Sequence, residues 1–194
     1  MSKLYRTHLG DDAWFALPEA VRAAHGDGAT SVFQGVFCVT RGTHLAAKLL
    51  APLLRAPPAC SQTAVRLIVE TSDDGGERWL RWFGDHLLTT SQRRGSDGTL
   101  RERFGPLELA FDLKADAEGI DYRQTAARLR CGLLSLQLPR WLSPRVAARE
   151  EVAAGKRSDE LRTHVRVELS LPLVGRVVAY DGTLNDLVPC GAPR

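Results

Sequence analysis

The stretch LELAFDLK, residues 107–114, alternates apolar and polar side chains along most of its length. Its apolar positions fall two residues apart, at Leu107, Leu109, Phe111 and Leu113. The polar residues between them are Glu108, Asp112 and Lys114. Successive side chains of a β-strand point to opposite faces of the sheet, so this period of two predicts a strand with one buried and one solvated face.

The same period recurs along most of the chain after residue 63. The segments AVRLIVET (64–71) and LRTHVRVELSL (161–171) each carry a one-sided apolar series, the second made of Leu161, Thr163, Val165, Val167 and Leu169. Between such segments lie short stretches with the composition of tight turns, among them SDDGG (72–76), GSDG (95–98) and ADAEG (115–119). About ten strands joined in this way predict an antiparallel meander.

The first 55 residues have a different, partly helical pattern. LPEAVRAAH (17–25) begins with a proline near its first turn, and THLAAKLLAPLLR (43–55) is typical of an amphipathic helix kinked or broken at Pro52. Between them, SVFQGVFCVTR (31–41) is rich in strand-forming residues.

We therefore predict one domain, residues 1–194, of the α+β class and mainly antiparallel β. Residues 1–55 would form a helical part with one strand, and residues 63–187 the strand meander. Because a strongly twisted sheet of this size usually curls or closes, we expect a barrel or half-barrel of about ten strands. The N-terminal helices would flank or plug it.

Composition and charge exclude several classes of protein. Hydrophobic residues make up 44% of the 194 residues, and the formal net charge is only +3. The nearest basic clusters, Arg93–Arg94 and Arg101–Arg103, are short or interrupted by an acid, so nucleic-acid binding is not expected. No apolar run approaches the roughly twenty residues of a membrane span, and the N-terminus lacks the apolar core of a signal peptide.

The cysteines and the short motifs give no cofactor or metal site. Four cysteines lie far apart with no C-x-x-C pair, so we expect neither a metal nor a redox centre, and a cytoplasmic location with free thiols. No nucleophile, metalloprotease or nucleotide-binding motif occurs.

If the protein is an enzyme, its candidate catalytic residues are Asp121, Glu102 and His164. Glu150 and Glu151 are adjacent, so in a strand they would point to opposite faces and could not act as a pair.

Aromatic residues supply a candidate binding site. Trp79, Arg81 and Phe83 share one face of their predicted strand, whereas Trp82 takes the other. Phe104 and Tyr122 belong to nearby strands. These side chains either fill a solid core or line a cavity, in which Arg81 or Arg123 would anchor the acidic headgroup of a ligand.

Two connections are unusually apolar for loops. LQLPRWLSP (136–144) contains Trp141, and LSLPLVG (169–175) repeats the pattern of a strand end running into proline and further apolar residues. Loops are normally polar because their backbone stays hydrated. Either both segments form an apolar mouth of the barrel, used for binding or membrane contact, or both fold over the N-terminal helices and are buried.

Three segments in this order resemble a bacterial family, the domain of unknown function 4166: GTLRERFGPLELAFDL, LQLPRWLSPRVAAREE and VELSLPLVGRVVAYDGTL. The segments LYRTHLG, LPEAVRAAHG and GERWLRWFG are similar to it as well, so the resemblance covers most of the chain. Members of this family occur alone or fused behind a dehydrogenase-like nucleotide-binding domain. The family has no assigned activity, so the resemblance implies no catalytic residues. Fusion to a dehydrogenase suggests that the domain presents or holds a hydrophobic substrate.

Our leading hypothesis is a non-catalytic module that binds a small hydrophobic or amphipathic ligand, similar to a lipid or isoprenoid, inside the barrel. Its candidate ligand-binding residues are Trp79, Arg81, Phe83, Phe104, Tyr122, Arg123 and Trp141. One alternative is an enzyme of the hydrolase, isomerase or dehydratase type that uses a carboxylate or histidine in the same cavity. Another is an interaction domain whose apolar loops dock a dehydrogenase-like partner.

Overall fold

A computed structural model of the chain describes residues 4–26, 30–132, 134–153 and 162–186. Within them, one sheet contains all the strands, which are β1 (Thr30–Arg41), β2 (Cys60–Thr71), β3 (Glu77–Phe83), β4 (His86–Arg94), β5 (Leu100–Phe104), β6 (Leu107–Ala115), β7 (Gly119–Cys131), β8 (Leu134–Gln137), β9 (Arg145–Val152), β10 (Arg162–Leu171) and β11 (Gly175–Asp186). The helices are α1 (Leu4–Leu9), α2 (Asp11–Ala16), α3 (Glu19–Ala24) and α4 (Leu45–Leu53).

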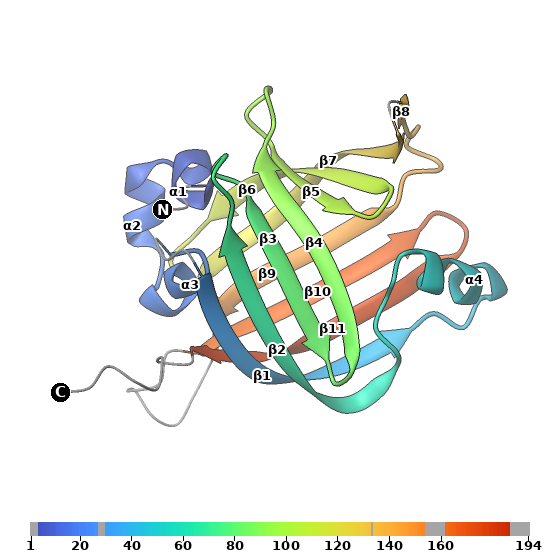
Figure 1. Cartoon of the computed structure of the whole chain (residues 1–194), viewed down its shortest axis with the longest axis horizontal. Helices are drawn as coiled ribbons and strands as arrows, with labels where there is room; N and C mark the ends of the chain where they lie inside the picture. The colour runs from blue at the N-terminus through green and yellow to red at the C-terminus, as the bar shows by residue number, and fades with distance from the viewer. Residues whose placement is uncertain (1–3, 27–29, 133, 154–161, 187–194) are drawn as a thin grey trace.

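Ten of these strands close into an antiparallel barrel (Figure 1). Consecutive strands from β1 to β7 pair with one another, β7 pairs with β9, and β9, β10 and β11 lead back to β1. The extra strand, β8, pairs with the end of β7 outside this ring. The predicted barrel of about ten strands, mainly antiparallel β, is confirmed, and β1 is one of its strands.

Strand β7 changes partner along its length. Its first residues, 119–123, pair with β9, whereas residues 128–131 pair with β8. Between these two parts, the Gln124 side chain replaces the backbone ladder. Its Nε2 atom donates a hydrogen bond to the Pro144 carbonyl at 2.7 Å, and its Oε1 atom accepts one from the Val146 amide at 2.7 Å. The loop before β9 is therefore held against the barrel wall.

The two-residue period divides the side chains between interior and exterior. In β6, Leu107, Leu109 and Phe111 are buried, whereas Asp112 and Lys114 are exposed. The inward series of β10 follows the same rule at Thr163, Val165, Val167 and Leu169, which are buried or partly buried. Leu161, which the sequence places in this series, lies outside the described residues.

Glu108 is a charged exception to the rule that outward side chains of β6 are exposed. It is buried although it points outward, because arginines surround its carboxylate. Arg130 lies 2.8 Å from Oε2, Arg93 lies 3.1 Å from the same atom, and Arg101 lies 3.8 Å from Oε1. Burial raises the pKa of Glu108, but the hydrogen bonds from Arg93 and Arg130 outweigh it and hold the pKa below its ordinary value.

The helices occupy the two ends of the barrel (Figure 1). Helices α1–α3 close one end, where Tyr5 and Val21 are completely buried. This agrees with the prediction that N-terminal helices flank or plug the barrel. Helix α4 lies at the other end and extends one residue past Pro52. None of the helices within the described residues has the length and apolar character that crossing a membrane requires.

Adjacent residues of β6 provide a test of this inside–outside division. We expect Phe111→Ala to lower the free energy of unfolding by about 3–5 kcal/mol, because it leaves a cavity in the core. Asp112→Ala, on the exposed face of the same strand, should change it by no more than about 0.5 kcal/mol. Urea unfolding measures both values. Equal losses for the two variants would contradict the orientation of β6.

Candidate functional site

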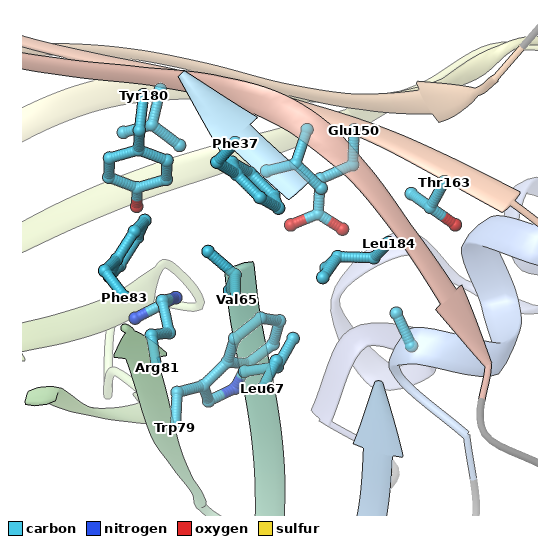
Figure 2. Close-up of a pocket in the computed structure, with 13 residues that line it drawn as sticks. Phe37, Val65, Leu67, Trp79, Arg81, Phe83, Glu150, Thr163, Tyr180 and Leu184 are labelled. Atoms are coloured by element: carbon cyan, nitrogen blue, oxygen red, sulfur yellow. The ribbon is translucent and has the colours of Figure 1, made fainter. Parts of the chain in front are cut away.

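A small cavity lies inside the barrel, between strands from opposite walls (Figure 2). Its volume is about 40 Å³, enough for a few water molecules. Most of its lining is apolar, and the principal members are Phe37, Val65, Leu67, Phe83, Val167 and Leu184. Arg81, Glu150, Thr163 and Tyr180 add polar atoms to this lining.

Strand β3 supplies one wall of the cavity. Trp79, Arg81 and Phe83 lie two residues apart, and all three point inward, as Figure 2 shows. Arg81 is held on three sides. It donates from Nη1 to the Thr90 hydroxyl at 2.8 Å, its Nη2 lies 3.4 Å from Glu102 Oε1, and its guanidinium lies 4.7 Å from the centre of the Trp79 ring. An interior guanidinium with these contacts is fixed in place and paired with a carboxylate.

Tyr180 faces Arg81 from β11. Burial raises the pKa of the Tyr180 hydroxyl to about 12, although the charge of Arg81 acts in the opposite direction. The hydroxyl is therefore protonated at neutral pH and can donate a hydrogen bond. Burial lowers the pKa of Arg81, but Tyr180 and Glu102 outweigh it and the net pKa is raised, so Arg81 is a permanent cation.

A second polar group joins the helical plug to the barrel wall. Glu150 of β9 lies with its Oε2 atom 2.7 Å from Nε2 of His25, just after α3. Its Oε1 atom accepts a hydrogen bond from the Tyr122 hydroxyl at 2.8 Å. Tyr5 of α1 stacks on the His25 ring at 3.6 Å, and its hydroxyl donates to Gln92 at 2.7 Å. The helices α1 and α3 are thus hydrogen-bonded to the interior as well as packed on it.

Glu150 is ionised in this setting. Burial raises the pKa of its carboxyl, but the interaction with His25, the hydrogen bond from Tyr122 and the charge of Arg81 outweigh that effect, and the net pKa is lowered. An ionised carboxylate only accepts hydrogen bonds, so His25 donates from Nε2. Nδ1 of His25 is buried and has no hydrogen-bond partner among the described residues.

A second cavity of about 30 Å³ lies toward the α4 end of the barrel. Its lining is apolar and includes Leu88, Phe104, Val146, Leu169 and Val178. Val167 and Tyr180 line both cavities, so these two side chains separate them.

The segment after α4 covers this second cavity. Leu54, Ala56 and Pro57 form part of its lining. The segment is fixed at both sides, because Arg41 donates to the carbonyls of Ala56 and Pro57, and Nε2 of His86 lies 2.8 Å from the Arg55 carbonyl. We refer to residues 54–57 as the cover segment.

The structure brings together five of the seven candidate ligand-binding residues. Trp79, Arg81 and Phe83 line the first cavity, Phe104 lines the second, and Tyr122 belongs to the Glu150 cluster. Arg123 and Trp141 are exposed, and Arg123 lines an open hollow on the outer surface. Of the candidate catalytic residues, Glu102 is inside the barrel.

The other two candidate catalytic residues lie on the outer face of the barrel. Asp121 pairs with Arg149 at 2.7 Å. Nε2 of His164 lies 2.9 Å from Asp181, and its Nδ1 atom lies 3.3 Å from Glu151. Among the described residues, no group of three histidine, cysteine, aspartate or glutamate side chains is placed to hold a metal ion.

Sequence reasoning missed Glu150, His25 and Tyr180 as interior polar residues. For Glu150 a signal was present: Val146, Ala148 and Glu150 lie two residues apart, so an inward Val146 requires an inward Glu150. The prediction that Glu150 and Glu151 point to opposite faces is correct, and Glu151 pairs outside with Arg149 at 2.7 Å.

The two apolar connections lie at the α4 end of the barrel, away from the plug (Figure 1). Trp141 and Leu173 are both exposed. The alternative that these segments fold over the N-terminal helices and are buried is wrong. Trp141, Leu142 and Leu173 instead project from the rim of the barrel. Other apolar side chains of the two segments, Leu138, Leu171 and Val174, pack partly against the core.

The family model described as Domain of unknown function (DUF4166) matches residues 17–184. The chain belongs to the DUF4166 family. No curated protein and no solved structure is detectably similar to this sequence. The match begins just before α3 and ends within β11, so it covers the residues that line both cavities. It also includes Glu150, His25 and Tyr122 of the buried cluster, whereas Tyr5 of α1 lies before it.

Glu150 and Glu151 form a matched pair for testing the buried cluster. We expect Glu150→Gln to lower the free energy of unfolding at pH 7 by about 2–4 kcal/mol, because it removes the charge that His25 and Tyr122 hold. Glu151→Gln, on the outer face, should cost no more than about 1 kcal/mol. Urea unfolding at pH 7 compares the two.

The variant Glu150→Gln should also change how the free energy of unfolding depends on pH. The pKa of Glu150 is lower in the folded protein than its ordinary value of 4.5, so its charge stabilises the fold above that pH. This contribution is lost as the pH falls through the lowered pKa. The free energy of unfolding of Glu150→Gln should therefore fall less steeply than that of the wild type between about pH 5 and pH 3. Parallel curves would show that Glu150 does not titrate as described.

Proposed function

We propose that this DUF4166 barrel binds a small, uncharged, amphipathic molecule in its interior. The observation that carries the proposal is the position of Arg81, a fixed cation set among the apolar side chains that line the first cavity. Arg81 and the Tyr180 hydroxyl would hold the polar group of the ligand. The apolar lining of the second cavity would receive its hydrocarbon part.

The charges around Arg81 favour a neutral headgroup over an acidic one. Glu102 already pairs with Arg81, and Glu150 contributes a second interior carboxylate. Glu77, the third buried glutamate of the interior, accepts a hydrogen bond from the Trp79 indole at 2.9 Å. An added carboxylate would meet repulsion from these groups, whereas a hydroxyl or carbonyl would not. A fatty or isoprenoid alcohol fits this chemistry.

Binding requires the interior to adjust. Each cavity is much smaller than the roughly 300–1,000 Å³ of a usual small-molecule site. Tyr180 lines both cavities, so a change in its rotamer would join them into one channel from Arg81 to the cover segment. We propose this joined form as the ligand-bound state.

The same groups give less support to catalysis. A general acid in a cavity needs a raised pKa, whereas that of Glu150 is lowered. Glu102 is engaged by Arg81, and Asp121 and His164 form ion pairs on the outer face. These contacts favour binding over the enzyme alternative.

An uncharged fluorescent dye, N-phenyl-1-naphthylamine, provides a test. We expect the protein to bind it, and Tyr180→Leu to bind it more tightly by about fivefold or more, because the smaller side chain joins the cavities. The matched control is Trp82→Leu, which removes a ring from the outer face of β3 and should leave dye binding unchanged. Fluorescence titration gives the affinities.

Competition between the dye and two ligands that differ in their headgroup tests whether the site prefers a neutral or an acidic group. 1-Dodecanol should displace the dye at concentrations about tenfold lower than dodecanoate at pH 7, because only the carboxylate is repelled by Glu102 and Glu150. Equal displacement would overturn the neutral headgroup. Absence of dye binding by both the wild type and Tyr180→Leu would overturn the interior site itself.

A further inference from the structure

Six exposed apolar side chains gather at the end of the barrel opposite the plug. They are Leu45, Leu49 and Leu53 of α4, Trp141 and Leu142 of the β8–β9 connection, and Leu173 of the β10–β11 turn. We call this set the apolar rim. The strand register places its three segments at one end, because Arg145 pairs with Ser170 and Arg41 pairs with Val178. Figure 1 shows α4, the β8–β9 connection and the β10–β11 turn on the side away from α1–α3.

Helix α4 is oriented opposite to a helix that faces water. Its small residues, Ala47 and Ala51, are buried against the barrel. Leu45 and Leu49 are each 71% exposed and Leu53 is 63% exposed, so the large apolar side chains form the outer face. A helix on an aqueous surface normally turns its leucines inward. This orientation therefore indicates that the outer face of α4 meets an apolar phase.

The β10–β11 turn gives an independent indication. Leu173 is 99% exposed and adopts a left-handed backbone conformation, with φ of 65°. Such positions in hairpin turns are usually taken by glycine, asparagine or aspartate, because a side chain such as leucine is strained there. A leucine at position 173 therefore does not stabilise the fold. Its apolar side chain projects from the tip of the turn.

Charge is distributed unequally between the two ends of the barrel. The described connections at the α4 end carry Lys48, Arg55 and Arg140 against one acid, Asp85. None of these three cations has an ion-pair partner among the described residues, and the same holds for Arg145 at the start of β9. The described loops between strands at the plug end are acidic, with Asp73, Asp74, Asp97, Asp116 and Glu118.

The sequence extends this asymmetry. Residues 28–69 and 122–149 contain no aspartate or glutamate, and these two ranges supply α4 and the β8–β9 connection. Free cations next to exposed leucines and a tryptophan match an interface that is apolar inside and negatively charged at its surface.

We propose that the apolar rim docks the barrel onto the surface of a membrane that contains anionic lipids. Trp141, Leu173 and the outer leucines of α4 enter the interfacial region, where tryptophan is favoured. Lys48, Arg55, Arg140 and Arg145 lie at the level of the lipid phosphates. The three apolar projections come from separate segments with cations between them, which suits a deformable lipid surface better than the flat patch of a protein partner. This docking does not depend on the proposed ligand.

Co-sedimentation with lipid vesicles tests the proposal. The purified protein should bind vesicles of phosphatidylcholine mixed with phosphatidylglycerol, and bind vesicles of phosphatidylcholine alone about tenfold more weakly or less. Added salt should release it, because the attraction to lipid phosphates is screened. Failure to bind the anionic vesicles at low salt would overturn the proposal.

Three variants separate docking from folding. Leu173→Asn suits the left-handed turn, so it should keep or raise the thermal stability while weakening vesicle binding about tenfold. The double variant Lys48→Glu, Arg140→Glu should abolish binding to anionic vesicles. Phe15→Gln removes an exposed ring from the plug end and should leave binding unchanged.

The alternative occupants of the rim give distinct results. If Leu173→Asn changes the sedimentation coefficient of the protein without vesicles, the rim joins copies of this chain and the membrane proposal is wrong. If Phe15→Gln weakens vesicle binding as much as Leu173→Asn does, contact is not confined to the rim and the assignment of this surface is wrong.

Discussion

The hydrogen bonds between β7 and β9 make this sheet a closed barrel, and the rest of the structure depends on that closure. Residues 119–123 pair with residues 147–151, and this contact removes the two edges that an open sheet would expose. The strands approach so closely that a Cβ atom at Gly119 would lie 1.9 Å from the Glu150 carbonyl oxygen. Glycine is therefore required where β7 begins. The same register pairs Ile120 with Glu150, and both side chains are buried.

Because the barrel is closed, every second side chain of its strands points into an interior without bulk water. This applies to charged residues as well as to apolar ones. A buried charge is tolerated only when it is paired and hydrogen-bonded. Glu150 obtains its partners from His25 and Tyr122, and Arg81 obtains its partners from Glu102 and Thr90. Because His25 follows α3, satisfying the Glu150 charge also fixes the plug. The polar cluster thus serves the assembly of the fold whatever else it does.

The sequence predicted the strands well because alternation is local, and Leu109 and Phe111 of β6 follow it directly. The same parity could have placed Glu150 inside, but no local pattern identifies a partner 125 residues away. The sequence alone also could not predict which face of α4 is buried. Apolar residues occur all round that helix, and only the tertiary packing of Ala47 and Ala51 against the barrel decides that the leucines face outward.

The end of α4 and the cover segment that follows it connect the apolar rim to the interior of the barrel. Leu53, the last residue of α4, is exposed on the outer face, whereas Leu54, its neighbour, lines the second cavity. Side chains from the ends of two strands, Arg41 and His86, hold the cover segment by its backbone carbonyls. Ala56 and Pro57 are also buried, so the cover segment is packed into this end of the barrel as well as hydrogen-bonded to it. Any force that displaces α4 therefore acts directly on the cover segment, and through it on the wall of the cavity that Tyr180 separates from Arg81.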